Sequence, residues 1–281
     1  MACSSDDSDE TTVRLPLSVE VSENPPMTRG EITKTSSLSS FLMQGSGTSY
    51  SVTKDGTWSS SPDDWPAGVG VDAEVTFYAY SSGTYNDGSN NPYIRLKVEN
   101  NIAVQKDLLV AKRTTTHSSC GGKVSLTFDH ACAAVQFSIA KTASLADCII
   151  TVESIVLCNV KNVGKYRYSD GTWFDVGVSA EGTGTDDYKL NTSSITVTET
   201  PTLLGSSSDN LFLIPQTLEP WDKSSTLANC YVVLDCEITG AKSYSGNAYI
   251  PFGITLEKGY IQPITISIGT GLRKGDGSKV F

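Results

Sequence analysis

The chain has 281 residues, a formal net charge of −10 and a hydrophobic content of 38%. Its length suits two small domains better than one, and its acidic balance argues against a nucleic-acid partner, whose phosphates attract Lys and Arg. No apolar run approaches the roughly 20 residues that a membrane-spanning helix needs. Short apolar stretches separated by Gly, Asn, Asp and Ser recur throughout, which is typical of an all-β sandwich.

The amino terminus, MACSSDDSDE, is acidic and lacks the charged and apolar regions of a secretory signal. Two interpretations of Cys3 stay open: the first residue of a mature bacterial lipoprotein after a cloning start, or a stray cysteine in an acidic disordered tail. The next stretch, VRLPLSVEV, alternates with period 2 and predicts a strand. Its apolar side chains share one face: Val13, Leu15, Leu17, Val19 and Val21. Pro16 lacks a backbone N–H, so this strand should lie at a sheet edge or pair in a special way.

Downstream, Pro25 and Pro26 break the chain, and EITKTSSLSSFLMQ predicts a second strand region. GTWSSSPDDWPAG is expected to be a loop that carries Trp58 and Trp65. Two Asp-Gly pairs, at 87–88 and 170–171, predict β-hairpin turns between short strands. By this pattern about seven strands precede residue 143 and about seven follow it, so two sandwiches are the natural division.

The stretch FDHACAAVQF contains His130, preceded by Asp129 and followed by Cys132. The apolar parity changes within this stretch, and a bulge or bend near 129–133 would reconcile its two halves. Histidine and cysteine two residues apart on one strand lie side by side, roughly 6–7 Å apart at the backbone. Nothing in the sequence activates the thiol, so a structural or surface histidine is favoured over a catalytic one. His130→Ala is accordingly expected to cost no more than about 1–2 kcal/mol. His117, in a polar connector, is expected to be solvated.

Six cysteines remain besides Cys3. Cys230 and Cys236 lie on one face of the same predicted strand, roughly 20 Å apart, too far to form a disulfide with each other. Bridges between other strands stay open, but buried thiols are favoured. Cys120, in the polar connector, is expected to be the most reactive. No C-x-x-C pair supports a zinc site, and no Gly-rich stretch has the context of a phosphate loop. No metal, cofactor or catalytic residue is therefore predicted.

Several stretches taken together resemble the fimbrillin family of Bacteroidales, the pilins of lipoprotein-derived fimbriae. In chain order they are the acidic start at Cys3, TRGEITKTSSLSSFLMQ (28–44), GTWSSSPDDWP (56–66), VTFYAY (75–80), KDLLVA (106–111), LTFDHACAAVQFSI (126–139), LFLIPQTL (211–218) and IPFGITLEKGYIQPITISIG (250–269). Each stretch is short, but their order and spacing extend over nearly the whole chain.

The resemblance implies an all-β protein with two transthyretin-like or Ig-like Greek-key β-sandwich domains. We expect an acidic lipoprotein leader and removable first strand at 1–29. The N-terminal sandwich would follow at 30–143, with the strand at 13–21 docked on it, and the C-terminal sandwich at 144–281. A boundary in the connector at 113–122 is the alternative.

The resemblance also implies a function: a cell-surface fimbrial subunit or fimbrillin-like adhesin, not an enzyme. Lipid on Cys3 would hold it in the outer membrane until an Arg-specific protease cuts between Arg29 and Gly30. The first strand, Val13 to Val21, would then leave a groove that accepts a strand from another fimbrial subunit. Family members that polymerise usually continue into an extra donor strand, whereas this chain stops at Phe281. A shortened copy and a terminal or tip subunit are the two alternatives.

Two other function classes are distinguishable. A non-polymerising surface lipoprotein would bind host glycan or host protein through its loops, and the aromatic and Asp-rich hairpins are compatible with that. A secreted hydrolase is the third class, and no motif favours it.

Overall fold

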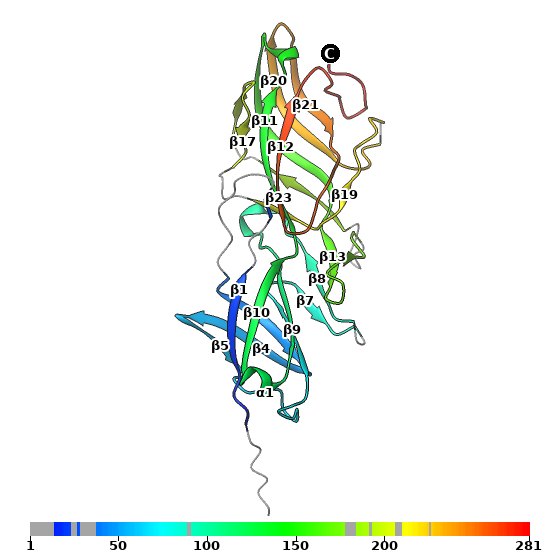
Figure 1. Cartoon of the computed structure of the whole chain (residues 1–281). Helices are drawn as coiled ribbons and strands as arrows, with labels where there is room; N and C mark the ends of the chain where they lie inside the picture. Colours follow the sequence, from blue (N-terminus) through cyan, green and yellow to red (C-terminus); the bar gives the residue numbers. More distant parts are fainter. Residues whose placement is uncertain are drawn as a thin grey trace, which may run out of the picture. The chain divides into compact units, whose positions relative to one another are not determined.

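The computed structural model describes residues 14–23, 27–28, 38–88, 91–177, 184–190, 193–205, 210–224 and 226–281. Within these ranges the chain is almost entirely β-structure (Figure 1). The described helices are short: α1 (His117–Cys120), η1 (Ile102–Val104) and η2 (Ala143–Leu145). None of them is long and apolar enough to cross a membrane. The predicted all-β class is confirmed.

The described chain divides into two compact units. The first consists of residues 14–22, Leu38–Ala79 and Ala111–Thr127, and the second contains the other described residues. Segments of the two units alternate along the chain, so residues 80–110 and residues 128–143 belong to the second unit. The number and the limits of independently folding domains stay a prediction.

The first unit is built on a seven-stranded sheet. Its strand order is β1 (Ser18–Glu23), β10 (Lys123–His130), β9 (Leu109–Thr115), β6 (Val75–Tyr80), β3 (Ser40–Gly45), β4 (Thr48–Asp55) and β5 (Thr57–Ser61). Alternate side chains of the central strands form its core, and Met43, Val52, Val75, Phe77 and Val124 are fully buried.

The prediction of a loop that carries Trp58 and Trp65 is wrong for Trp58, which lies within β5 (Thr57–Ser61), whereas Trp65 lies outside the strands. It sits opposite Lys54 of β4, and its ring packs against Phe41 of β3 at 5.4 Å between centroids. The serine-rich sequence lacks the apolar alternation of a typical strand, yet it forms a polar edge strand after a tight turn from β4.

The second unit contains four further sheets. One has the order β17 (Thr202–Leu203), β11 (Ala133–Lys141), β23 (Tyr260–Ile268) and β2 (Met27–Thr28), with β18 (Leu211–Leu213) also on β11. A second has the order β15 (Thr185–Lys189), β12 (Cys148–Lys161), β20 (Tyr231–Gly240) and β21 (Tyr244–Pro251), with β16 (Ile195–Val197) also on β12. The third has the order β14 (Trp173–Phe174), β13 (Val163–Arg167), β8 (Tyr93–Lys97) and β7 (Thr84–Asn86), and the fourth pairs β19 (Thr217–Leu218) with β22 (Ile254–Thr255). The antiparallel pairs β7–β8 and β13–β14 confirm both predicted hairpins.

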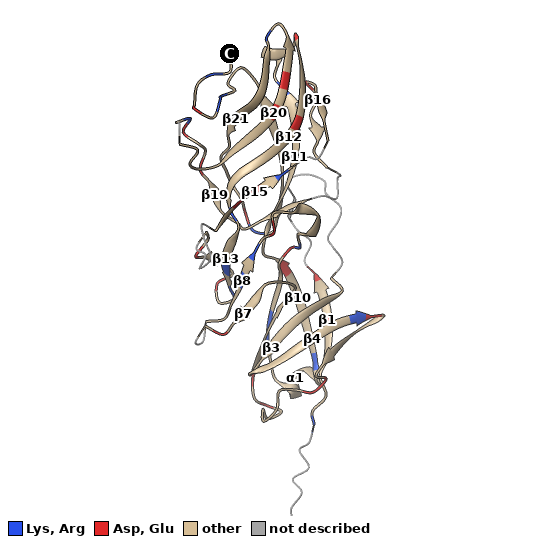
Figure 2. Ribbon diagram, turned by 180° about the vertical axis from the view of Figure 1, so that it is seen from behind, with Lys and Arg blue, Asp and Glu red and all other residues tan. Residues whose placement is uncertain are grey.

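Charged residues are unevenly distributed over the strands of the second unit (Figure 2). The long strands β12 and β20 carry Glu153, Asp235 and Glu237, whereas β8 and β13 carry Arg95, Lys97, Lys165 and Arg167. A basic sheet face therefore exists within an acidic protein.

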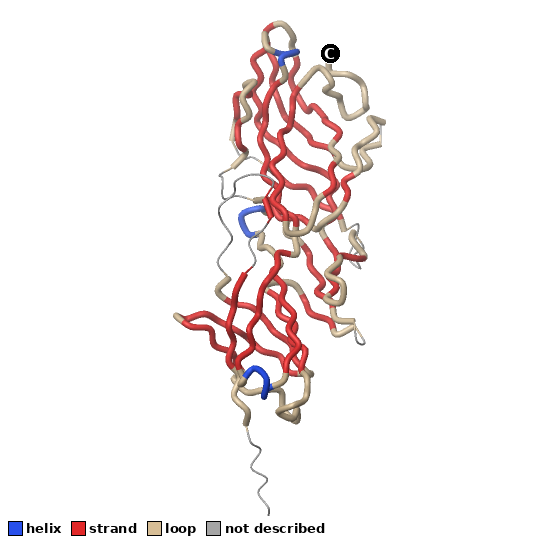
Figure 3. The backbone as a smooth tube through the Cα atoms, in the orientation of Figure 1, coloured by secondary structure: helices blue, strands red, loops and turns tan. Residues whose placement is uncertain are grey.

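The predicted bend near 129–133 is confirmed. β10 ends at His130 and β11 begins at Ala133, and the two strands belong to different sheets. Figure 3 shows how much of the backbone is strand, with such short links between strands. Because the chain changes sheet here, Phe128 and Val135 are both buried although their parities differ.

Candidate assembly site at the first strand

The described part of the predicted first strand keeps its alternation of side chains. Leu17 and Val19 are 5% and 6% exposed, and Leu15 and Val21 are half-buried, while the side chains between them face outward. Val13 lies outside the described residues. Regular strand structure begins at Ser18 and reaches Glu23, later than the predicted range of 13–21.

The later start has a physical cause, because the residues before Ser18 pair on the opposite edge. The N–H of Leu17 donates to the carbonyl of Asp63 at 2.6 Å, and the N–H of Trp65 donates to the carbonyl of Leu15 at 2.7 Å. Pro16 lies between them, in an antiparallel bridge with Asp64. The backbone of Pro16 thus faces away from this ladder, so its missing N–H leaves no bond unmade.

β1 itself pairs with β10. The N–H of Ser18 donates to the carbonyl of Gly122 at 2.8 Å. Further along, Glu20 accepts from Ser125 at 3.1 Å, and the hydroxyls of Ser22 and Thr127 are 3.0 Å apart. The partners advance in the same direction on both strands, so β1 and β10 run parallel.

β1 is also the last strand in its sheet order, so β10 is its only strand neighbour among the described residues (Figure 1). A parallel pair is slightly less stable per residue than an antiparallel one. The first strand is thus an edge strand whose inner face is buried.

Two residues, His117 and Gly122, contact the backbone at the start of the first strand. Neither residue was assigned to this site from the sequence. His117 is half-buried, so the prediction that it is solvated holds only in part. Its ring packs edge-on against Trp65 at 5.2 Å between centroids, and Nε2 lies 3.2 Å from the carbonyl oxygen of Pro16. Because a carbonyl only accepts, Nε2 carries the hydrogen in this contact.

Gly122 permits the close approach of the strand. It adopts a φ of +75°, and a Cβ there would lie 2.5 Å from the carbonyl oxygen of Pro16. Only glycine fits such a position. The pair Gly121-Gly122 after the polar connector was the signal in the sequence that could have indicated it.

A family model described as fimbrillin-like matches residues 29–280. The chain belongs to this family. Among solved structures, this fimbrillin-like chain is similar to a fimbrial protein from Bacteroides vulgatus, with a TM-score of 0.57 and 17% identity over 90% of this chain and 95% of that one. It is also similar to a candidate cell-adhesion protein from Bacteroides eggerthii, with a TM-score of 0.52 and 12% identity over 95% of this chain and 90% of that one. At such identities the likeness shows the fold alone. No curated protein matches the chain.

The predicted processing and lipidation residues of this fimbrillin-like chain, Arg29, Gly30 and Cys3, lie outside the described residues. Immediately before Arg29, β2 pairs in parallel with β23, with Met27 opposite Tyr260. The groove role of the first-strand side chains and the cut after Arg29 stay predictions.

His130 belongs to a buried polar contact in the second unit. Its Nδ1 contacts a carboxylate oxygen of Asp107, and the two side chains are only 10% and 4% exposed. Burial alone would lower the pKa of His130. The hydrogen bond and charge of Asp107, with smaller contributions from Glu23 and Asp129, outweigh burial and raise that pKa.

The neighbouring thiol is unsuited to catalysis. Cys132 is fully buried, and burial together with the charge of Asp107 raises its pKa well above the ordinary value. The other carboxylate oxygen of Asp107 accepts a hydrogen bond from the backbone N–H of Cys132 at 3.4 Å. A thiol that stays protonated is a poor nucleophile, so the geometry favours a structural role for these three residues.

All six described cysteines are free thiols. Cys120 is half-buried, and the other five are buried: Cys132, Cys148, Cys158, Cys230 and Cys236. The prediction that Cys230 and Cys236 are buried and not bridged to each other is confirmed.

Proposed function

We propose that this fimbrillin-like chain is a cell-surface fimbrial subunit that assembles by exchange of its first strand. The observation that carries the proposal is the edge position of β1 together with its buried inner face. A central strand could not leave without opening the sheet, whereas an edge strand can leave and the remaining six strands keep their neighbours.

Loss of the strand would create a surface that binds another strand. Burial of Leu17 and Val19 contributes about 1.5–3 kcal/mol each, and that apolar area would be exposed to water. The edge of β10 would at the same time present unpaired backbone groups, which are a template for a new strand. Main-chain hydrogen bonds would supply affinity, and the pockets left by the apolar side chains would fix the register.

A protease cut after Arg29 is the proposed trigger. The segment SENPPMTRG is polar, as exposed cleavage sites often are. Arg14, the other early arginine, is protected because the carbonyl of the next residue, Leu15, is hydrogen-bonded to Trp65. The family match begins at residue 29, so the segment that would be released lies outside the matched region except for Arg29 itself. Release would also detach the subunit from a lipid on Cys3.

The packing of residues 272–273 within their own unit supports a subunit that does not donate this segment to a neighbour. The N–H of Tyr249 donates to the carbonyl of Arg273 at 2.8 Å, and the N–H of Arg273 donates to the carbonyl of Tyr249 at 3.2 Å. Leu272 beside this pair is only 2% exposed. Because these residues complete their own unit, we propose a terminal or tip position.

Limited proteolysis and one substitution test the proposal. An Arg-specific protease at low dose should cut the folded protein first after Arg29, giving a fragment with Gly30 at its amino terminus. Arg29→Ala should leave a folded, membrane-held monomer that forms no ladder on a gel, whereas Arg14→Ala should behave like the parent. Fimbriae that contain uncut Arg29→Ala protein, or a first cut inside either unit, would contradict strand exchange and favour a non-polymerising surface lipoprotein.

A further inference from the structure

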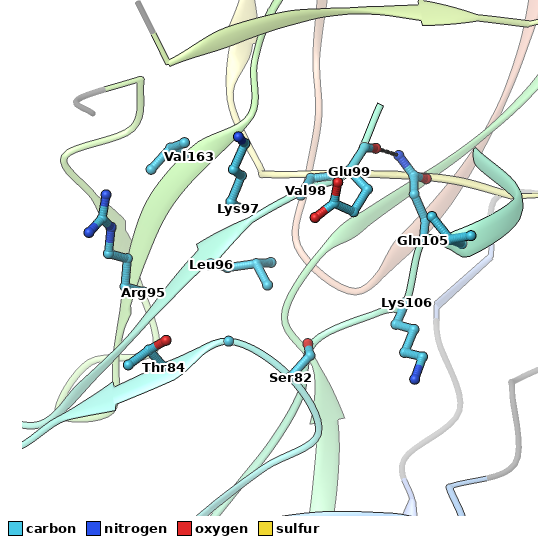
Figure 4. A pocket seen from close by; sticks show the side chains of 12 residues that line it. Ser82, Thr84, Arg95, Leu96, Lys97, Val98, Glu99, Gln105, Lys106 and Val163 are labelled. Carbon is cyan, nitrogen blue, oxygen red and sulfur yellow. Dashed lines mark hydrogen bonds between the residues drawn. The ribbon is translucent and has the colours of Figure 1, made fainter. Parts of the chain in front are cut away.

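A pocket of about 410 Å³ opens in the second unit where β7 and β8 separate (Figure 4). Thr84, the first residue of β7, lies opposite Arg95 of β8. Before Thr84 the chain turns away at Gly83, which has a φ of +86°. A Cβ on Gly83 would lie 2.7 Å from the carbonyl oxygen of Arg95, so this separation requires glycine.

Three cations line the pocket: Arg95, Lys97 and Lys106. All three are exposed, and none forms an ion pair with any residue in the described ranges. Figure 4 shows them at separate places around the rim, with Leu96 between them. In a chain of net charge −10, three unpaired cations around one pocket are an anion-binding feature.

The strand register adds a like-charge contact. Lys165 of β13 lies directly opposite Arg95 of β8, and like charges in that position destabilise a sheet. Lys165 has a counter-ion in Asp175, with 2.8 Å between Nζ and the carboxylate oxygen. Arg95 has none among the described residues, so an anion bound at the pocket would relieve this repulsion.

The remaining lining groups indicate what else the ligand carries. The carboxylate of Glu99 also lines the pocket, and it attracts hydrogen-bond donors while it repels a plain anion. Ser82 also lines the pocket, and its hydroxyl oxygen is buried without a hydrogen-bond partner in the described part of the chain. Val104 is 56% exposed and Leu96 is 5% exposed, so apolar surface lies beside the charges.

We propose that this pocket binds an acidic saccharide unit, a sugar ring that carries a carboxylate or a sulfate group. Arg95 and Lys97 are two residues apart on one strand face, and they would hold the acid group, with Arg95 able to form a bidentate contact. Ring hydroxyls would donate to Glu99, and the C–H face would rest on Val104. A sugar ring presents several hydroxyl donors close together to Glu99, and the pocket volume lies within the range of about 300–1,000 Å³ typical of small-molecule sites.

NMR titration of the full-length monomer with five probes tests the proposal: glucuronic acid, glucose 6-sulfate, glucose, inorganic sulfate and tetraglutamate. The two acidic sugars should bind with a Kd on the order of millimolar, and glucose and inorganic sulfate at least about tenfold more weakly. Binding of only one acidic sugar would identify its acid group as the preferred one. Added salt should weaken binding.

Variants distinguish binding at the pocket from non-specific attraction of anions to exposed cations. Arg95→Gln with Lys97→Gln should raise the Kd by about tenfold or more, and Val104→Asp should do the same by adding negative charge at the rim. Lys189→Gln with Lys274→Gln changes the net charge equally at exposed positions outside the pocket and should leave the Kd unchanged. The proposal is overturned if the control pair weakens binding as much, if glucose or sulfate binds as tightly as the acidic sugars, or if tetraglutamate binds tighter than both acidic sugars. The measurement uses unassembled protein, so its result is independent of strand exchange.

Discussion

In the second unit β23 pairs in parallel with β11, from Ala134 opposite Ile261 to Lys141 opposite Ile268, whereas in the first unit β1 pairs in parallel with β10 at the end of the sheet order. β11 and β23 are interior strands of their sheet, with further strands on their other edges. Both pairs are therefore parallel, but β23 lies in the interior of its sheet, whereas β1 lies at the edge of its sheet.

The difference teaches that position in the sheet decides whether a strand can be replaced. Removal of β23 would separate β11 from β2 and open the middle of a sheet. Removal of β1 leaves β10 and the five strands beyond it paired, and exposes one row of buried side chains. Exchange of the first strand is consistent with this asymmetry, and exchange of β23 is not.

Of the substitutions in the two compared strands, Ile266→Ala in β23 should have the largest effect. Ile266 is only 3% exposed, and truncation of a buried isoleucine leaves a cavity that costs about 2–5 kcal/mol. Urea denaturation should show this loss, while Thr265→Ala, an exposed neighbour on the same strand, should stay within about 0.5 kcal/mol of the parent. Equal losses for the two variants would show that β23 does not form the interior of its sheet.

Leu17→Ala in the first strand should cost less, about 1.5–3 kcal/mol, because an edge strand can shift to fill the space. Hydrogen exchange should show faster exchange of the amides of Ser18–Glu23 and unchanged protection of Tyr260–Ile268. Ser18→Ala, with an outward side chain, is the matched control. If Leu17→Ala loosens both strands equally, the proposed independence of the first strand is wrong.

Much of this comparison could be predicted from local patterns. The alternation around Leu17 and Val19 indicated a half-buried strand, and Pro16 indicated an edge, because both signals depend on the chain's own geometry. Gly88 and Gly171 likewise marked hairpin turns. Such signals need no knowledge of distant residues.

The rest depended on partners far apart in the sequence. Nothing near His130 indicates that Asp107, 23 residues earlier, would meet it. That contact replaces the expectation of about 1–2 kcal/mol for His130→Ala with about 3–5 kcal/mol, because Asp107 would remain buried without its partner. The basic pocket had one local signal, Arg95 and Lys97 on the outward face of an apolar strand, but Lys106 joins them only in the fold.

The His130–Asp107 contact in the second unit predicts that stability depends on pH. The folded state raises the pKa of His130, so its contribution to stability is complete below the ordinary pKa of about 6.5. That contribution disappears as the pH rises through the folded pKa. Urea denaturation at pH 6 and pH 9 should show that the parent loses more stability on the alkaline side than His130→Gln does. An equal loss in both proteins would show that another group is responsible.

The smallest expected change in stability is that of Cys120→Ser, and thiol labelling compares the reactivity of Cys120 in the first unit with that of Cys230 and Cys236 in the second. Burial raises the pKa of Cys230 to about 12 and that of Cys236 to about 11, so both thiols stay protonated and unreactive in the folded second unit. Cys120 is half-buried in α1, two residues before Gly122, whose carbonyl accepts from Ser18 at the start of the first strand. A thiol reagent should therefore label Cys120 first, and Cys120→Ser should change stability by no more than about 0.5 kcal/mol. Denaturation without reductant should then expose Cys230 and Cys236 to labelling. A peptide with a disulfide between those two would contradict their assignment as separate buried thiols, and native labelling of Cys236 ahead of Cys120 would contradict the expected order of reactivity.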